Sequence, residues 1–336
     1  MTVKVGINGF GRIGRLTARA IFEQKRDDIE IIAINDPGGN FFPLLKYDSI
    51  HGRAPFTVER DGDDAIIIDG KRIRRFRSRN PEGCPWGEED VDIMMECTGK
   101  FKDREGAQAH MDMGAKKILI SAPGIDEDLT VVYGVNHDLI KAEHKIISNA
   151  SCTTNCLAPV AYALNETIGI EKGFMTTIHA YTGDQNLVDG SHKDPLRARA
   201  AAMSMIPAST GAAKAVGKVL PELNGKLDGV AIRVPTPNVS MVDLTFQPSK
   251  KTSVEEVNQA VTSYANGKLK GVLAVYDDPC VSCDFNHDPH SSIFSLAGTK
   301  VVDEDFVRVM SWYDNEWGFS CRMIDTALEM HRKGYA

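Results

Sequence analysis

The segment from Asn149 to Cys156 combines thiols with hydroxyl groups at the start of a predicted helix. Before it, residues 145–147 have the apolar pattern of a buried strand, and after it residues 157–164 have the pattern of a helix. Cys152 therefore lies at a strand-to-helix turn, where Ser151 suits the N-cap position. Unpaired backbone N–H groups and the positive end of the helix dipole favour a thiolate there. The segment predicts that Cys152 is a nucleophile with a lowered pKa and that Cys156 packs in the core.

Hydroxyl groups beside Cys152 change how a single cysteine is interpreted. Taken alone, a cysteine is more often a small buried hydrophobic residue than a nucleophile. Ser151, Thr153 and Thr154 add hydroxyls and backbone N–H groups that suit an anionic oxygen or a phosphate better than a closed core. We therefore expect a catalytic thiol beside an anion site.

Length and composition indicate a two-domain globular protein. The 336 residues are too many for one ordinary hydrophobic core, and 42% hydrophobic with 25% charged residues is typical of soluble proteins. The net charge of -7 argues against a dedicated nucleic-acid binder, and the basic run at residues 71–79 alternates like the solvent-facing side of a strand. The seven cysteines lack a disulfide-framework spacing. Without a secretion signal or a membrane-spanning apolar run, we expect free thiols, no membrane partner and a cytoplasmic location.

A glycine-rich turn follows the first predicted strand, residues 3–8. Gly9, Gly11 and Gly14 form a G-x-G-x-x-G motif, and residues 15–23 after it have helical spacing. In this order of strand, glycines and helix, the motif binds a dinucleotide whose pyrophosphate lies on the helix N-terminus. The candidate cofactor contacts of the turn are Gly9, Gly11, Arg12 and Ile13.

Asp36 ends the second predicted strand, residues 29–35, and stands 22 positions after Gly14. A carboxylate at this point accepts hydrogen bonds from the ribose hydroxyls and repels a 2′-phosphate, which predicts NAD rather than NADP. Pro37 holds Asp36 extended, however, and residues 38–39 are glycines that leave little bulk beside a 2′-phosphate. NADP is therefore expected as a weaker alternative cofactor.

Strand and helix patterns alternate through the first half of the chain, as a doubly wound parallel sheet requires. Further strands are predicted at residues 91–97, 117–120 and 129–135, and a helix at residues 104–113. Thr98 and Ser121 follow two of these strands and are expected to line the cofactor crevice. Asp69 and Gly70 predict a hairpin turn.

The second half is richer in long strands of the antiparallel type, predicted at residues 174–181, 229–235 and 239–246. The first of them carries His179 near its end. Residues 182–206 are irregular, and irregular spans of this length are usually functional. The fold class expected is α/β, with a Rossmann-type doubly wound parallel sheet followed by an α+β catalytic domain with a mainly antiparallel sheet.

Two cysteines and two histidines stand close together in the sequence, at Cys280, Cys283, His287 and His290. These residue types can bind zinc. The spacing is wrong for a zinc finger, because the residues that normally separate the two pairs are absent. We therefore expect no metal site.

Residues 151–156 and 311–318 resemble the signatures of the phosphorylating glyceraldehyde-3-phosphate dehydrogenases, and the resemblance extends over essentially the whole chain. It implies that Cys152 is the nucleophile and that His179 activates its thiol. It also implies that Thr182 and Arg233 hold the substrate's phosphate. Further anion-binding residues, for the attacking inorganic phosphate, would be Ser151, Thr153, Arg197, Thr210 and Gly211. The cofactor contacts would include Arg79, and Asn315 would orient the nicotinamide.

The reaction implied by this resemblance is the NAD-dependent oxidation and phosphorylation of D-glyceraldehyde 3-phosphate to 1,3-bisphosphoglycerate, a step of glycolysis and gluconeogenesis. It would pass through a hemithioacetal and a thioester on Cys152. Two alternatives stay open: an erythrose-4-phosphate dehydrogenase on the same scaffold, and a non-catalytic NAD-binding scaffold protein.

Domain boundaries and assembly are also implied by the resemblance. An amphipathic helix predicted at residues 319–331 would pack back on the first domain, giving an NAD-binding domain of residues 1–150 plus about 316–336 and a catalytic domain of residues 151–315. A homotetramer is implied, with residues 182–206 reaching a neighbouring subunit. Ser191 in this span stands where NADP-tolerant relatives carry serine and NAD-strict relatives often carry proline.

Overall fold

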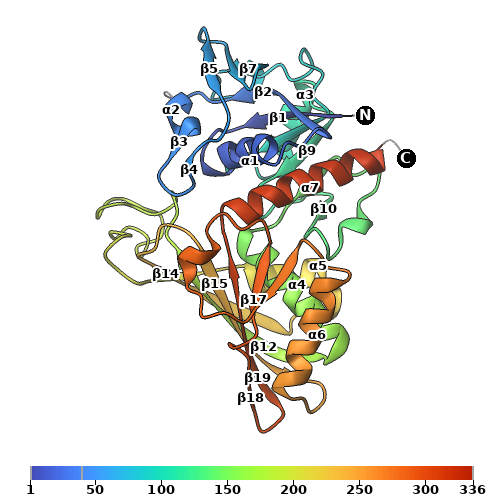
Figure 1. Ribbon diagram of the computed structural model, residues 1–336. Coiled ribbons are helices and arrows are strands. Elements are labelled where there is room, and N and C mark those ends of the chain that lie inside the picture. Colours follow the sequence, from blue (N-terminus) through green and yellow to red (C-terminus); the bar gives the residue numbers. More distant parts are fainter. Residues whose placement is uncertain (1, 39–40, 335–336) are drawn as a thin grey trace. The chain divides into compact units, whose positions relative to one another are not determined.

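The computed structural model describes residues 2–38 and 41–334. The low side-chain bulk predicted at Gly39 beside a 2′-phosphate therefore lies outside the described residues. The chain divides into two compact units (Figure 1). Unit 1 contains residues 1–151 and 320–336, and unit 2 contains residues 152–319.

Unit 1 is built on a mixed sheet whose described strands follow the order β10-β11-β9-β8-β1-β2-β7-β6-β5. Neighbours are parallel from β10 to β7, and the β7–β6 and β6–β5 pairs are antiparallel. These strands are β1 (Val3–Asn8), β2 (Ile29–Asn35), β5 (Val58–Asp61), β6 (Ala65–Ile68), β7 (Lys71–Phe76), β8 (Ile93–Glu96), β9 (Lys117–Ile120), β10 (Leu129–Thr130) and β11 (Ile146–Ser148). A separate pair consists of β3 (Tyr47–Asp48) and β4 (Gly52–Arg53).

The strand order reverses at β1, which has β2 on one side and β8 on the other. In open parallel sheets, ligands bind beyond the carboxyl ends of the strands at such a switch point. Here those ends are Asn8 and Glu96, which lead into Gly9 and Thr98. The glycine-rich turn and one predicted crevice residue are thus brought together by the topology.

Three helices of unit 1 match predicted helical patterns, and the short α2, residues 41–46, was not predicted. They are α1 (Arg12–Glu23), α2 (Phe41–Lys46), α3 (Arg104–Asp112) and the part of α7 (Trp317–Gly334) that begins at residue 320. Side-chain contacts anchor α7 in unit 1, because Thr326 donates a hydrogen bond to Asn149 over 2.8 Å and Lys117 donates one to the Met330 carbonyl over 3.2 Å. The last helix therefore packs with the first part of the chain.

The predicted strand at residues 129–135 was wrong in length, since β10 contains only Leu129–Thr130. The side chain of Asn136 folds back on this segment, accepting a hydrogen bond from the Val132 N–H over 2.8 Å and donating one to the Thr130 carbonyl over 3.0 Å. Because these backbone groups are satisfied by a side chain, the apolar run turns instead of continuing the sheet. The hairpin predicted at residues 69–70 is confirmed, with φ of 45° at Asp69 and 77° at Gly70.

Unit 2 contains the mainly antiparallel sheet that was predicted. Its described strands follow the order β13-β14-β12-β15-β19-β17-β16, with β18 paired to β19, and β12–β14 and β16–β17 are the parallel pairs. The strands are β12 (Ile170–Ala180), β13 (Ile206–Ser209), β14 (Leu227–Val234), β15 (Ser240–Pro248), β16 (Leu273–Tyr276), β17 (Ser292–Ser295), β18 (Lys300–Val302) and β19 (Phe306–Tyr313).

One face of this sheet is covered by helices α4 (Cys152–Thr167), α5 (Ala212–Val219) and α6 (Val254–Asn266) (Figure 1). Along β15 buried and partly exposed residues alternate strictly, as expected for a strand with one covered face. Phe174 and Val230 stand out as exposed apolar residues on β12 and β14. Residues 182–205 contain turns and bends without a helix or strand, as predicted.

Candidate active site

Cys152 is the first residue of α4 and follows a tight turn after β11. Ala150 in this turn has φ of 55°, a left-handed conformation that costs a residue with a Cβ about 1–2 kcal/mol. Its backbone N–H is held by the Ser148 hydroxyl at 3.1 Å. The turn places the thiol at the helix N-terminus, and Cys156 one turn later is fully buried, as predicted.

His179 lies near the end of β12, with its Nε2 3.6 Å from the Sγ of Cys152. Its Nδ1 is 2.7 Å from the carbonyl oxygen of Ala180. A carbonyl can only accept a hydrogen bond, and this contact is shorter than the 3.1 Å between Nδ1 and the Arg233 Nη1 donor, so we assign the proton to Nδ1. The lone pair of Nε2 then faces the thiol, which is the arrangement that a general base requires.

Desolvation is the largest influence on the pKa values of Cys152 and His179. It raises the pKa of Cys152 above its ordinary value, while the Arg233 charge and hydrogen bonds from Thr153 act in the opposite sense. The predicted lowering of the Cys152 pKa by the helix N-terminus is therefore wrong, because desolvation of the thiolate outweighs it. Burial, with the charges of Arg233 and Arg197, lowers the pKa of His179 to about 3, so the imidazole is neutral at pH 7.

Tyr313 fixes the start of α4 against the sheet. Its hydroxyl lies 2.8 Å from the Thr153 hydroxyl and 2.9 Å from the Thr177 hydroxyl, and its ring meets the His179 ring edge to face at 6.0 Å. All three hydroxyls are buried. This hydrogen-bonded chain joins α4, β12 and β19 beside the thiol and imidazole.

Arg233 on β14 is the register partner of His179 on β12. Its Nη1 lies 3.1 Å from the His179 Nδ1, 3.4 Å from the Ala180 carbonyl and 3.5 Å from the Thr182 hydroxyl. The structure therefore brings Cys152, His179, Arg233 and Thr182 together. Their combination of thiol, base and guanidinium suits a substrate that carries both an electrophilic carbon and an anionic group.

The second predicted arginine, Arg197, comes from the irregular span. Its guanidinium pairs with Asp184, lies 3.3 Å from Asp194 and donates to the Ser209 carbonyl over 3.4 Å. Thr210 and Gly211 follow Ser209 at the start of α5, where the Thr210 hydroxyl accepts a hydrogen bond from the Ala212 N–H at 3.2 Å. Ser151 directly precedes α4.

Asn315 lies between β19 and α7 and is almost fully buried. Its Oδ1 accepts a hydrogen bond from the Ser240 hydroxyl over 2.8 Å. The neighbouring Asp314 accepts bonds from the backbone N–H groups of Glu316 and Trp317 and from the side chain of Asn238. These contacts fix the orientation of the Asn315 amide within unit 2.

The glycine-rich turn of unit 1 has the geometry that its motif predicts. Gly9 has φ of 90°, and a Cβ there would lie 2.8 Å from the Thr98 backbone nitrogen. A Cβ on Gly14 would lie 2.1 Å from the Gly9 carbonyl oxygen, so α1 packs closely against the turn. Around Gly11, by contrast, the structure leaves open space. A pyrophosphate can therefore approach this backbone, and the turn fits a dinucleotide.

The other predicted cofactor residues of unit 1 are at strand ends. Thr98 donates hydrogen bonds to the Glu96 carboxylate from its N–H and hydroxyl, and Ser121 follows β9, with its N–H bonded to the Glu96 carbonyl. Asp36 follows β2, and its carboxylate accepts a bond from the Gly38 N–H at 3.1 Å. Arg79 is exposed just beyond β7. The side chain of Arg12, the first residue of α1, is bound to Asp48, at 2.5 and 3.2 Å.

A buried polar network behind this crevice was missed by the sequence analysis. Asn8 links the Glu96 carboxylate to the His110 Nε2, and Trp86 donates to the His110 Nδ1 over 3.1 Å. Burial raises the pKa of Glu96 to about 7 and lowers that of His110 to about 4. A carboxylate at the end of an otherwise apolar strand was the signal that could have revealed it.

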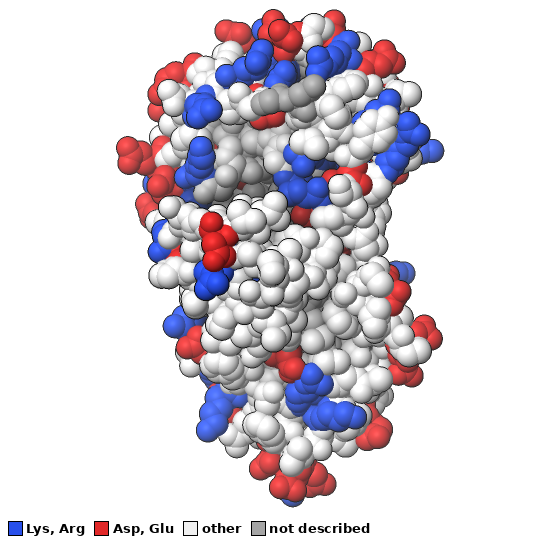
Figure 2. Space-filling view, turned by 90° about the vertical axis from the view of Figure 1, so that its left-hand side faces the viewer, with Lys and Arg blue, Asp and Glu red and all other residues white. Residues whose placement is uncertain are grey.

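The next features concern metal-binding groups, membrane-spanning helices and surface charge. Within residues 2–38 and 41–334 there is no group of three or more His, Cys, Asp or Glu side chains placed to hold a metal ion, and the seven cysteines are free thiols. Among the described helices, none is long and apolar enough to cross a membrane. Basic and acidic side chains are interspersed over the face in Figure 2.

Comparison with known proteins gives matches over nearly the whole chain. Residues 3–104 match the family described as glyceraldehyde 3-phosphate dehydrogenase, NAD binding domain, and residues 151–315 match its C-terminal domain. The chain is 60% identical over 336 residues to a glyceraldehyde-3-phosphate dehydrogenase of Xanthobacter flavus, covering 99% of this chain and 100% of the relative. It is 59% identical over 334 residues to the enzyme of Cereibacter sphaeroides, with 99% of each chain covered. The identity to the enzyme of Mycolicibacterium smegmatis is 54% over 332 residues, with 97% of each chain covered.

Proposed function

Because this chain belongs to the glyceraldehyde-3-phosphate dehydrogenase family, we propose that it oxidises D-glyceraldehyde 3-phosphate with NAD and inorganic phosphate to 1,3-bisphosphoglycerate, in glycolysis and gluconeogenesis. The observation that carries this proposal is the 3.6 Å contact between the Cys152 thiol and the His179 Nε2, beside the guanidinium of Arg233. A nucleophile, a base and an anion-binding cation are the three groups that this reaction requires.

The first step is attack of the Cys152 sulfur on the aldehyde carbon. The thiol proton passes to His179 Nε2 as the carbon–sulfur bond forms, and the imidazolium then gives this proton to the oxygen, so that the hemithioacetal carries a hydroxyl and His179 is neutral again. Proton transfer within the pair leaves the net charge unchanged, and opposite charges at this distance stabilise each other. The neutral state of His179 at pH 7 keeps the base available.

Oxidation leaves the acyl group on Cys152 as a thioester. When bound, NAD accepts the hydride that leaves the aldehyde carbon. His179 takes the hydroxyl proton of the hemithioacetal, so that the carbonyl forms. Inorganic phosphate then attacks this carbonyl, the carbon–sulfur bond breaks, and the acyl phosphate is released with Cys152 restored.

Two groups of side chains would hold the two anions. We assign the substrate's phosphate to Arg233 and Thr182, because the guanidinium reaches the Thr182 hydroxyl and stands beside the catalytic pair. Inorganic phosphate is assigned to the hydroxyls that flank the thiol and to the segment fixed by Arg197 at the start of α5. The residues of this second group are Ser151, Thr153, Arg197, Thr210 and Gly211.

NAD would be held mainly by unit 1. The open backbone at Gly11 and the first turn of α1 suit the pyrophosphate, and the Asp36 carboxylate suits the adenine ribose. The remaining contacts are assigned to Gly9, Arg12, Ile13, Arg79, Thr98 and Ser121, with Asn315 of the catalytic domain on the nicotinamide. The corresponding domains are residues 1–150 plus about 316–336 for NAD and residues 151–315 for catalysis.

A homotetramer in the cytoplasm completes the proposal. Apolar side chains on one sheet face and in the irregular span are largely exposed in the single chain, among them Phe174 at 50%, Leu187 at 77% and Met203 at 84%. Exposed apolar groups of this kind favour burial against a second copy of the chain. The free thiols suit a reducing compartment.

An aldehyde panel assayed with and without phosphate tests the proposed activity. NADH formation from glyceraldehyde 3-phosphate should exceed that from erythrose 4-phosphate and should require phosphate for turnover beyond the first acylation. Preference for erythrose 4-phosphate would instead identify the alternative substrate. Absence of turnover with every aldehyde would indicate a non-catalytic NAD-binding scaffold, whereas stoichiometric labelling of Cys152 by iodoacetamide with loss of turnover would exclude it.

A further inference from the structure

Side-chain hydrogen bonds join the carboxyl ends of β2, β1 and β8 within unit 1. Asn35 donates from Nδ2 to the Asn8 Oδ1 over 2.7 Å, and Asn8 donates from Nδ2 to the Glu96 carboxylate. The carboxylate also accepts the N–H and the hydroxyl of Thr98. Three of these residues are buried and Thr98 is partly exposed. We call Asn35, Asn8, Glu96 and Thr98 the strand-end network.

The backbone of Ser78 fixes the orientation of both amides in the network. Its N–H donates to the Asn35 Oδ1 over 3.0 Å, and its carbonyl accepts a bond from the Asn35 Nδ2 at 2.9 Å. Exchanging the oxygen and nitrogen of Asn35 would break both bonds, so Nδ2 is the atom that faces Asn8. Asn8 then directs its oxygen to Asn35 and its N–H group to Glu96. The Asn8 amide and the Thr98 N–H can therefore only donate to the Glu96 carboxyl.

Opposing effects act on the charge of Glu96. The residue is 1% exposed, and burial raises its pKa to about 7, whereas the hydrogen bonds from Thr98 and Asn8 act in the opposite sense. Near neutral pH the carboxyl therefore exchanges between an ionised and a protonated form. The protonated form needs an acceptor for its O–H, and an N–H group cannot serve as one.

The Thr98 hydroxyl is the partner of Glu96 that can change its role. When Glu96 is ionised, the hydroxyl donates to the carboxylate and its oxygen accepts the Lys100 N–H at 3.0 Å. When Glu96 is protonated, the hydroxyl accepts the carboxyl O–H instead, and its own proton is released to another acceptor. Thr98 contacts the glycine-rich turn, because a Cβ on Gly9 would lie 2.6 Å from the Thr98 Cγ2. The proton is thus released beside the position expected for the dinucleotide.

We propose that Glu96 is a positioning residue that takes up a proton when the dinucleotide binds and thereby turns the Thr98 hydroxyl from Glu96 to an oxygen of the cofactor. The inference rests on the proposed function, because it requires a dinucleotide on the glycine-rich turn. A dinucleotide supplies ribose and phosphate oxygens as acceptors, and its negative charge disfavours a second negative charge at Glu96. Both effects favour the protonated carboxyl in the bound state. Each ionised chain that binds the cofactor therefore takes one proton from solvent.

Charged and titratable groups near Glu96 come from α3, from the segment around η1 (Pro81–Gly83) and from the residue after β8. They are His110, Glu82, Cys84 and Cys97. β1 and β9 contribute the Asn8 amide and the Ser121 N–H, which do not titrate. Burial lowers the pKa of His110 to about 4 and raises the pKa of Cys84 and of Cys97 to about 12. These three groups therefore keep their charge between pH 6 and pH 9, whereas Glu96 changes its charge.

Calorimetric titration of NAD into the full chain, in buffers of different ionisation enthalpy, measures the proton uptake. If binding raises the pKa of Glu96 by about one unit, about 0.4 proton per chain should be taken up at pH 7 and less than about 0.1 at pH 5. The affinity that this proton contributes is complete below the pKa of the free protein and is lost as the pH rises through that of the bound state. NAD affinity should therefore fall about eightfold from pH 6 to pH 9. Binding of NAD at pH 7 without proton uptake would overturn the inference.

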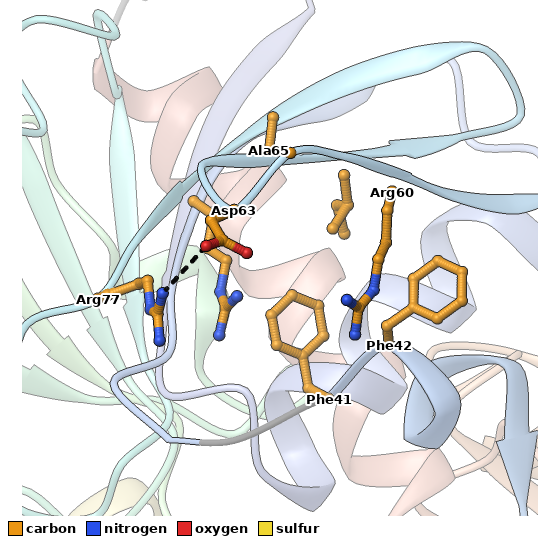
Figure 3. A pocket seen from close by; sticks show the side chains of 9 residues that line it. Phe41, Phe42, Arg60, Asp63, Ala65 and Arg77 are labelled. Carbon is orange, nitrogen blue, oxygen red and sulfur yellow. Dashed lines mark ion pairs between the residues drawn. The ribbon is translucent and has the colours of Figure 1, made fainter.

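Glu96→Gln keeps the size of the side chain but cannot change its charge. Its proton uptake at pH 7 should be less than about 0.1, and its NAD affinity should change less than about twofold from pH 6 to pH 9. Asp63→Asn is the control, because this carboxylate is exposed and lines a different cavity of unit 1 with Arg60 and Arg77 (Figure 3). It should keep the pH dependence of the wild type. Weaker NAD binding by Glu96→Gln with the wild-type pH dependence would indicate a merely structural role and overturn the proposal.

Two substitutions of Thr98 test the hydroxyl in a chain that keeps Glu96. Thr98→Val preserves the shape of this partly exposed side chain but removes the hydroxyl, so proton uptake at pH 7 should fall at least about threefold. Thr98→Ser retains the hydroxyl and should keep the uptake within about twofold of the wild type. Unchanged uptake by Thr98→Val would overturn the proposal.

The same titrations separate this inference from the proposed function. NAD binding by the wild type without proton uptake would overturn the role of Glu96 and leave the proposed function standing. A wild-type chain that binds no NAD would overturn both.

Discussion

At the residue scale, the chemistry depends on how Cys152 and His179 share one proton. Burial raises the pKa of the thiol and lowers that of the imidazole, so each group alone favours its neutral form. The assigned Nδ1–H to Ala180 contact leaves Nε2 as acceptor at 3.6 Å from the sulfur. Attack on an aldehyde and proton transfer to Nε2 are therefore expected to be coupled.

Replacing the nucleophile should abolish the reaction without disturbing the cofactor site. Cys152→Ala should leave less than about 1% of wild-type NADH formation, because no other group can carry the acyl intermediate. NAD affinity, measured by calorimetry, should stay within about threefold, since the glycine-rich turn belongs to unit 1. Cys283→Ala is the control, because this thiol is exposed and free and should retain full activity. Substantial turnover by the Cys152 variant would rule out its assigned role.

Removal of the base should slow acylation and change its pH dependence. His179→Asn should lower the acylation rate by about two to four orders of magnitude, the usual range of general acid–base assistance. Without a proton acceptor at Nε2, the partly buried thiol must ionise alone, which desolvation disfavours. The midpoint of the iodoacetamide alkylation rate against pH should therefore move to higher pH than in the wild type. An unchanged profile would place the base elsewhere.

At the element scale, two turns lead into helices: the glycine-rich turn within unit 1 and the turn that precedes α4 of unit 2. The turn after β1 needs glycine at position 9, because φ is 90° and Thr98 is in contact. The turn after β11 holds Ala150 in a left-handed conformation, secured by the Ser148 hydroxyl. Both turns lead into a helix start, at α1 and α4, and backbone N–H groups at a helix start suit an anion or a carbonyl oxygen.

Two glycine substitutions should separate stability from cofactor binding. Gly9→Ala should destabilise the protein by at least about 2 kcal/mol, since a Cβ meets the Thr98 backbone and the left-handed φ is unfavourable. Gly11→Ala should leave the melting temperature nearly unchanged, because the space around it is open, but should weaken NAD at least about tenfold. Thermal denaturation and calorimetry measure the two effects. If Gly11→Ala kept wild-type NAD affinity, the pyrophosphate would not lie on this turn.

At the scale of the whole molecule, unit 2 exposes several large apolar side chains. Helices cover one face of its sheet, whereas Phe174 and Val230 are 50% and 39% exposed. The irregular span adds apolar side chains that the described residues do not cover. Association with other copies would bury these groups.

The mass in solution tests this proposal. Light scattering at micromolar concentration should give four times the 36.8 kDa of the chain. Phe174→Asp should shift the population toward smaller species, because it places a charge where an apolar contact is expected. Val302→Asp is the control, since Val302 is 56% exposed on β18 at a different part of the sheet. A wild-type monomer would remove the support for a tetramer.

Local patterns in the sequence were enough to predict the strand, glycine turn and helix of the cofactor motif and the helix that begins at Cys152. β1, β2 and β9 have the predicted bounds, and the G-x-G-x-x-G turn and the helix after Cys152 lie where the pattern placed them. These features depend on periodicity, glycine conformation and helix ends, all of which act over a few residues. The strand predicted at residues 129–135 was too long. The Asn136 side chain accepts a hydrogen bond from the Val132 N–H, which therefore does not extend β10.

Only the tertiary structure decided which distant residues meet and how strongly they are buried. The parallel register of β12 and β14 sets Arg233 beside His179, and no spacing in the sequence contains that pairing. Burial reversed the expected pKa shift of Cys152, because desolvation depends on every element packed around the thiol. The buried network of Asn8, Glu96 and His110 likewise joins residues from two strands and a helix. A motif within one short segment can be predicted from the sequence, because it depends on neighbouring residues. Contacts and charge interactions between distant segments arise only when the chain folds.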